Sequence, residues 1–106
     1  MIFTVGDFSR EVDNMDVYVV KKYEESLESF YKRVAGIDMK GSASGIYGEI
    51  VDAGEEMMDK MFGEGAAREM FRESRSVRKI MTAVCALNSF MNDVGGVVSE
   101  MRRIGA

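Results

Sequence analysis

The sequence predicts a small, mostly α-helical domain of three main helices and a short connecting helix, with a short β-hairpin at its N-terminus. Three stretches carry apolar residues at the three- and four-residue spacing of a helix, and none of the 106 residues is proline, the residue least compatible with helix interiors. Gly36, Gly63 and Gly65 mark expected helix ends. The length suits one hydrophobic core, so we expect residues 1–106 to form a single domain.

The first twelve residues predict a pair of strands. Apolar side chains at Ile2, Phe3 and Val5 precede Gly6-Asp7, and Phe8 follows directly. A Gly-Asp pair between short apolar runs is typical of a tight turn between antiparallel strands. We therefore expect residues 1–12 to form the hairpin before the helices begin.

A first helix is predicted between about residue 14 and Gly36. Its apolar stripe consists of Val20, Tyr23, Leu27, Phe30 and Val34. Asp13 or Asn14 has the side-chain oxygen that a helix N-cap needs, and Gly36 is suited to the C-terminal end. The opposite face of this segment is charged, as expected for an amphipathic helix at the surface.

Residues 36–45 contain three glycines and two serines and are predicted to form a flexible linker. A second helix then extends to Phe62, with Gly54 allowing close contact with another helix. Gly63 is expected to end it in a left-handed conformation, after which Ala66–Phe71 forms the short connecting helix.

The last predicted helix follows a cap at Ser74 or Ser76 and is the longest. Its apolar residues recur at near-heptad spacing: Val77, Ile80, Met81, Val84, Leu87, Met91, Val94, Val98 and Met101. Gly95-Gly96 is expected to kink this helix, and Cys85 is interpreted as a small buried hydrophobic residue. Two shorter helices cannot easily cover so long an apolar face, so we expect a homo-oligomer.

The composition argues against most enzyme classes. The chain has no histidine and one cysteine, which excludes a Ser-His-Asp triad, a Cys-His pair and zinc sites built on histidine or several thiolates. No phosphate-binding Gly-x-x-x-x-Gly-Lys-Ser/Thr run occurs. The acidic residues at helical spacing in the second helix are interpreted as a solvated face rather than a cation site: Asp52, Glu55, Glu56 and Asp59. We therefore expect a non-enzymatic protein without a cofactor or metal.

Charge is distributed unevenly along the chain. Residues 1–64 carry 14 acidic and 7 basic side chains, whereas residues 65–106 carry 4 acidic and 7 basic ones. Five basic residues lie close together: Arg68, Arg72, Arg75, Arg78 and Lys79. The net charge of −4 and the interspersed Glu69 and Glu73 favour pairing with the acidic half, within or between chains, over binding to nucleic acid.

The sequence also predicts no association with a membrane. It contains no run of about eighteen uncharged apolar residues, the length that a membrane-spanning helix needs. Its first residues lack the charged head and long apolar middle of a signal peptide. We therefore expect a cytoplasmic protein.

Three sequence patches together resemble one protein family. The first is Val12-Asp13-Asn14-Met15-Asp16, which leads to Lys22-Tyr23-Glu24-Glu25-Ser26-Leu27. The second is Phe62-Gly63-Glu64-Gly65-Ala66, with Phe71 beyond it. The third is Ser76-Val77-Arg78-Lys79, which precedes a helix with Leu87 and Phe90. In this order they are similar to the small tail assembly chaperones of long-tailed, siphovirus-type phages and prophages of Gram-positive bacteria.

This resemblance implies a non-enzymatic phage tail assembly chaperone in the bacterial host cytoplasm. Such a protein binds and solubilises the tape-measure protein during tail assembly and releases it as tail-tube subunits polymerise, which makes the tail-tube protein a second candidate partner. The family provides no motif of ligand residues, so a binding site has to be inferred from this chain.

The methionines suggest where a client would bind. Six of the nine internal methionines lie between residues 57 and 91. Flexible, polarisable thioethers adapt to imperfect partners. The candidate partner-binding residues are Met57, Met58, Met61, Phe62, Met70 and Phe71. Consecutive apolar positions cannot all face one narrow stripe, which favours an exposed patch; the alternative is that these side chains fill the core.

Two other classes of function remain open from the sequence. One is a small secreted or partner-paired helical hairpin of the type VII secretion kind, although the Trp-x-Gly turn of that class is absent because the chain has no tryptophan. The other is an antitoxin-like regulatory module that binds one protein partner through its last helix.

Overall fold

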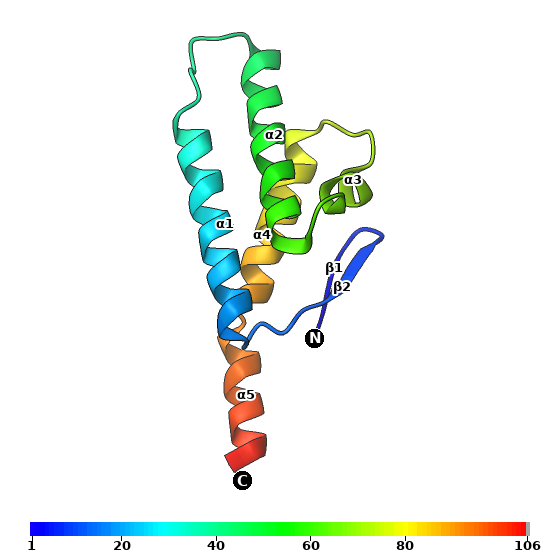
Figure 1. Ribbon diagram of the computed structural model, residues 1–106, viewed down its shortest axis with the longest axis vertical. Helices are drawn as coiled ribbons and strands as arrows, with labels where there is room; N and C mark the ends of the chain where they lie inside the picture. Colours follow the sequence, from blue (N-terminus) through cyan, green and yellow to red (C-terminus); the bar gives the residue numbers. More distant parts are fainter. Residues whose placement is uncertain (106) are drawn as a thin grey trace.

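The computed structural model describes residues 1–105. Its elements are β1 (Ile2–Val5), β2 (Phe8–Glu11), α1 (Val17–Ala35), α2 (Ala43–Phe62), α3 (Ala66–Phe71), α4 (Val77–Met91) and α5 (Val94–Gly105). Helices α1 and α2 form an antiparallel hairpin, α4 packs against α2, and α5 extends from one end of the body (Figure 1). The molecule is elongated, with extents of 57 × 26 × 20 Å. The predicted mostly helical fold with an N-terminal β-hairpin is confirmed.

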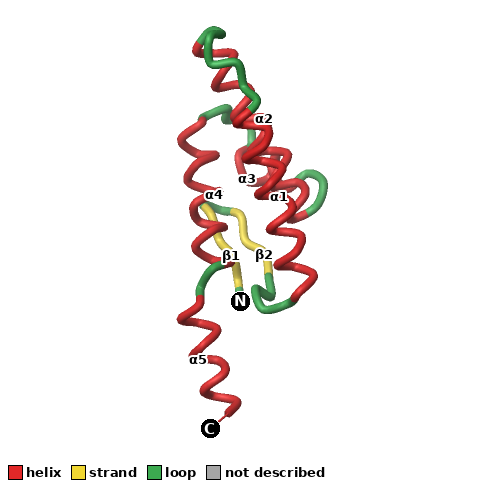
Figure 2. The backbone as a smooth tube through the Cα atoms, turned by 90° about the vertical axis from the view of Figure 1, so that its left-hand side faces the viewer, coloured by secondary structure: helices red, strands yellow, loops and turns green. Residues whose placement is uncertain are grey.

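The β-hairpin is fastened to the helices by an aromatic cluster. Strands β1 and β2 pair antiparallel, and Gly6, with a φ of 56°, makes the turn between them. Phe3 and Phe8 are buried, and both contact Phe62 at the end of α2, with ring centroids 5.3 and 5.2 Å apart. Phe90 of α4 meets the Phe3 ring edge-on, which keeps β1 beside α4 (Figure 2).

Helix α1 begins later than predicted because a turn precedes it. The side chain of Asp13 accepts the N–H of Met15, and the actual N-cap is Asp16, which accepts the N–H groups of Tyr18 and Val19. Asn14 is buried instead and donates to the backbone oxygen of Phe90, 3.0 Å away. The predicted end at Gly36 is confirmed.

The predicted linker at residues 36–45 is too long by three residues. Helix α2 already begins at Ala43, because the hydroxyl of Ser42 caps it by accepting the N–H of Gly45. The predicted close contact at Gly54 is confirmed: a Cβ atom there would lie 2.3 Å from Cγ2 of Ile80 on α4.

Asp59 stabilises the glycine-rich joint between α2 and α3 by accepting two backbone hydrogen bonds. Asp59 accepts the N–H of Ala67 on its side chain and the N–H of Gly63 on its backbone oxygen, both at 2.8 Å. The bounds predicted for α3 are confirmed. The left-handed conformation falls at Gly65 rather than at Gly63, whose φ of 102° is combined with an extended ψ of 159°.

The predicted long last helix is divided into α4 and α5, and the break lies at residues 92–93 rather than at Gly95-Gly96. Asn92 ends α4: its side-chain amide donates to the backbone oxygen of Asn88 and to the hydroxyl of Tyr23 on α1. The prediction that Cys85 is buried is wrong. Its neighbours Val84 and Leu87 face the core, and Cys85 lies on the exposed side of α4.

Candidate functional site

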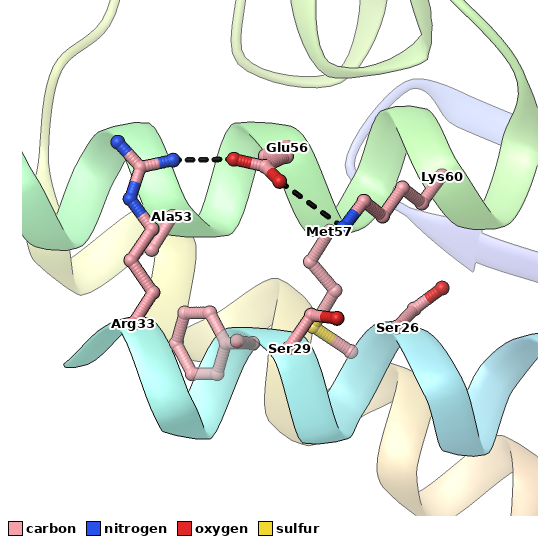
Figure 3. A pocket seen from close by; sticks show the side chains of 8 residues that line it. Ser26, Ser29, Arg33, Ala53, Glu56, Met57 and Lys60 are labelled. Atoms are coloured by element: carbon pink, nitrogen blue, oxygen red, sulfur yellow. Dashed lines mark hydrogen bonds and ion pairs between the residues drawn. The ribbon is translucent and has the colours of Figure 1, made fainter. Parts of the chain in front are cut away.

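Three of the predicted client-binding methionines belong to the core. Met57, Met58 and Met61 are 1%, 0% and 5% exposed, so the predicted exposed patch is wrong for them. The reason is that α1, α3 and α4 all pack against α2, which makes its buried face wider than a single stripe. Met57, for example, points toward Ser29 of α1 (Figure 3).

The other candidates are divided between the core and the surface. Phe62 is half-buried and stacks on Phe3, so it mainly anchors the hairpin. Phe71 is almost fully buried, whereas Met70 beside it is half-buried. Of the six predicted positions, Met70 and Phe71 line the most spacious hollow described on the molecule.

The acidic residues of α2 are engaged in contacts within the chain. Glu56 binds Arg33 of α1 and Lys60 one turn further on (Figure 3). The Lys60 ammonium, and after it Arg33, holds the pKa of the Glu56 carboxyl below its usual value. Asp52 and Glu55 both bind Arg75, at 2.8 and 2.7 Å.

Three of the four acidic residues on this face of α2 therefore form ion pairs, and the fourth, Asp59, accepts the N–H of Ala67. Within residues 1–105 no three His, Cys, Asp or Glu side chains are gathered in a way that could hold a metal ion. Arg75 pairs with the acidic half of its own chain, as predicted.

The candidate site is a surface hollow of about 550 Å³ between the hairpin turn, α3 and the start of α4. We call it the hairpin–α3 hollow. Its apolar side chains are Val5, Met70 and Phe71. The rest of its lining consists of Gly6 and the polar or charged residues Asp7, Glu69, Arg72, Arg78, Lys79 and Thr82. The N-terminal hairpin thus builds one concave surface with α3 and α4, two consecutive helices about sixty residues later in the chain.

Charge in the hairpin–α3 hollow is unbalanced. Glu69 is bound by Arg10 of β2 at 2.5 Å, and this hydrogen bond lowers the pKa of its carboxyl. Asp7 lies 3.6 Å from Arg72. Arg78 and Lys79, in contrast, form no ion pair with any residue in the described part of the chain, and they lie in the first turn of α4, where the helix dipole adds positive potential.

A second hollow, of about 240 Å³, includes Arg10, the residue that binds Glu69 of the hairpin–α3 hollow. It is lined by Arg10, Glu11, Val12, Asp13, Val19, Lys22, Met61 and Phe62. Its basic and acidic side chains are equal in number, so it lacks the net positive charge of the hairpin–α3 hollow.

The sequence identified only part of the hairpin–α3 hollow. Met70 and Phe71 were predicted as binding residues, and the basic cluster that includes Arg78 and Lys79 was recognised but assigned to ion pairing. No sequence pattern marked Val5 as a binding residue, because its position in the hollow depends on where the whole hairpin packs.

Fold and site together define a small helical protein with an N-terminal β-hairpin and an apolar, positively charged hollow beside it. A family model matches residues 6–102, and the chain belongs to this family, a family of unknown function designated DUF6673. No curated protein and no solved structure matches the chain significantly. Among residues 1–105, no helix combines the length and apolar character needed to cross a membrane.

Proposed function

We propose that this protein is a non-enzymatic binding protein that holds an apolar helical segment of a partner in the hairpin–α3 hollow. The supporting observation is the composition of that hollow. The half-buried Met70 forms its apolar floor with Val5 and Phe71, and at its edge lie Arg78 and Lys79, which have no ion-pair partner among residues 1–105. Its volume of about 550 Å³ falls within the ~300–1,000 Å³ typical of binding pockets. Helix-in-groove recognition uses apolar anchors of this kind.

The partner we propose is the tape-measure protein of a long-tailed phage, kept soluble in the host cytoplasm while the tail assembles. The order and spacing of the three patches that resemble tail assembly chaperones support this choice, and the Phe62-Gly63-Glu64-Gly65 joint is one of them. The same joint positions α3, and α3 supplies Met70 and Phe71 to the hollow. The tail-tube protein is the second partner that this function would involve.

The edge of the hollow specifies which client segments fit best. An apolar anchor residue would be flanked by acidic side chains that face Arg78 and Lys79. Part of the affinity is then electrostatic and is screened by salt, since the Debye length falls to about 3 Å at 1 M ionic strength. The apolar part persists at high salt. We expect binding to weaken with salt without being abolished.

Co-purification tests this proposal. The full chain is co-expressed with tagged fragments of a tape-measure protein, and the captured amounts of Met70→Ser and of the double variant Arg78→Glu/Lys79→Glu are compared with wild type. Both variants should lose most of the captured client, because one removes the apolar anchor contact and the other reverses the charge of the edge.

Two control variants lie outside the hollow. Met81→Ser changes another methionine, 43% exposed on α4, and Lys21→Glu reverses an exposed charge on α1. Both should bind like wild type, and circular dichroism should show unchanged helix content in all four variants. Hollow variants that fold normally and still retain the client would contradict the proposal, as would a wild-type chain that captures no fragment.

A further inference from the structure

Helix α5 exposes an apolar face that no other element of residues 1–105 covers to a large extent. Val98, Met101 and Ile104 are 39%, 65% and 78% exposed. The helix projects beyond the body (Figures 1 and 2), and none of the principal contacts between the described elements involves it. An isolated helix of twelve residues is marginal in water, because most helical stability comes from packing of the apolar face.

The exposed face of α5 continues the buried face of α4. Val84, Met91 and Val98 follow one another at intervals of seven residues, the repeat of a helix that packs along another helix. Val84 and Met91 are buried within the body, whereas Val98 is 39% exposed and belongs to α5, the helix that projects beyond the body. The pattern of a packed helix therefore extends past the last element that could cover it.

A second exposed apolar surface lies beside the root of α5. It consists of Met15, Val17 and Tyr18, which are 48%, 76% and 84% exposed, and we call it the basal patch. The start of α1 is held at the end of α4 by two side chains: Asn14 donates to the Phe90 backbone, and the Tyr23 hydroxyl donates to Asn88 at 2.6 Å.

Charged residues of opposite sign lie beside the basal patch and near the tip of α5. Asp13 and Asp16 flank the basal patch, and both are exposed. Arg102 and Arg103 lie near the tip of α5, where Arg103 also binds Glu100 of its own helix. Acidic groups thus lie at the root end of α5 and basic groups at its tip.

We propose that two copies of this chain associate through antiparallel α5 helices, with the tip of each α5 contacting the basal patch of the other copy. At 1.5 Å per residue α5 is about 18 Å long, so in an antiparallel pair the tip of one helix lies opposite the root of the other. Ile104 then meets Val17 and Tyr18, and Arg102 lies near Asp16. Such an interface is self-complementary about a two-fold axis.

The charges and the surface area favour this arrangement over simpler ones. A parallel pair would bring the arginines of both tips together, and like charges placed opposite one another oppose association. Stable complexes bury roughly 800 Å² per partner, which is more than the apolar stripe of one twelve-residue helix provides. The basal patch adds three further apolar side chains per copy, among them the large Tyr18 ring.

The oligomeric state of the isolated full chain tests this inference, and no client is required. Sedimentation equilibrium should show a monomer–dimer exchange. Met101→Ser/Ile104→Ser should raise the dissociation constant at least tenfold with little change in α1 to α4. The matched control Met39→Ser, in the loop at the opposite end of the molecule and 71% exposed, should leave it unchanged. A wild-type chain that remains monomeric at high micromolar concentration would overturn the proposal.

Cross-linking tests the antiparallel geometry. In a Cys85→Ser background, which removes the exposed native thiol, the double variant Tyr18→Cys/Ile104→Cys should give a covalent dimer with a short thiol cross-linker. Ile104→Cys alone should not, because antiparallel helices place the two Ile104 positions at opposite ends of the pair. Efficient cross-linking of the single variant would overturn the antiparallel arrangement. Because these measurements use the protein alone, their failure is distinguishable from a failure to bind tape-measure fragments.

Discussion

Gly54→Ala provides a quantitative test of the packing between α2 and α4. The added Cβ would lie 2.3 Å from Cγ2 and 3.1 Å from Cδ1 of Ile80, whereas carbon atoms in contact are normally about 3.5–4.0 Å apart. Ile80 is 1% exposed, so its side chain is enclosed by other atoms of the protein. The two helices therefore have to separate, or Ile80 has to adopt a poorer rotamer.

The expected size of the effect follows from two opposing terms. Overpacking a well-packed core costs about 1–3 kcal/mol. Replacing glycine by alanine within a helix recovers up to about 1 kcal/mol. We expect Gly54→Ala to lower the free energy of unfolding by about 0.5–2 kcal/mol, which corresponds to a fall of several degrees in Tm for a domain of this size.

Gly48→Ala is the matched control, because it is the same change in the same helix. The nearest atom to its added Cβ is Nη2 of Arg75 at 3.9 Å, an ordinary contact. Without a clash, only the reduced freedom of the unfolded chain and the better helix propensity remain. Gly48→Ala should therefore raise the free energy of unfolding by about 0.4–1 kcal/mol.

Urea and thermal unfolding followed by circular dichroism measure both effects. A double-mutant cycle identifies the contact: Ile80→Ala alone should cost about 2–5 kcal/mol, and less when Gly54→Ala is present, because the new methyl group partly fills the space that Ile80 leaves. If Gly54→Ala is as stable as wild type, or the two changes are strictly additive, the close approach of α2 and α4 at this position is refuted.

Further predictions concern the contacts that join the helices. Tyr23→Phe removes the hydroxyl that donates to Asn88 and accepts from Asn92, and urea titration should show a loss of about 0.5–1.5 kcal/mol; an unchanged stability would contradict the contact. Burial raises the pKa of Tyr23 above its usual 10.0, so the folded protein holds this proton more tightly than the unfolded chain does. The contribution of this group is thus constant below pH 10 and decreases as the pH rises further, and the decrease should be smaller in Tyr23→Phe. Asp59→Ala removes the acceptor for the N–H of Ala67 and should cost about 0.5–2 kcal/mol, whereas Asp59→Asn, which keeps an acceptor oxygen, should cost less; equal losses would argue against the capping role.

The sequence by itself determined most of the secondary structure. The bounds of α3 and the helix ends at Gly36 and Phe62 agree with prediction, because apolar spacing, caps and glycine conformations act over only a few residues. The errors at this level were also local. Asp16 is the N-cap of α1 instead of Asp13 or Asn14, and Ser42 caps α2 inside the predicted linker.

Tertiary structure alone decided which apolar residues are accessible. Met58 lies in an apolar run that looked too wide for one helix face, and it is fully buried because neighbouring helices surround α2. The end of α4 at Asn92 involves a bond to the hydroxyl of Tyr23, 69 residues earlier in the chain. Val5 and Arg78 face one hollow only because the hairpin packs beside α3 and α4. Helical periodicity indicates which side chains are apolar and need to be buried. The elements that bury them are distant in the sequence, and the position of those elements depends on the packing of the whole chain.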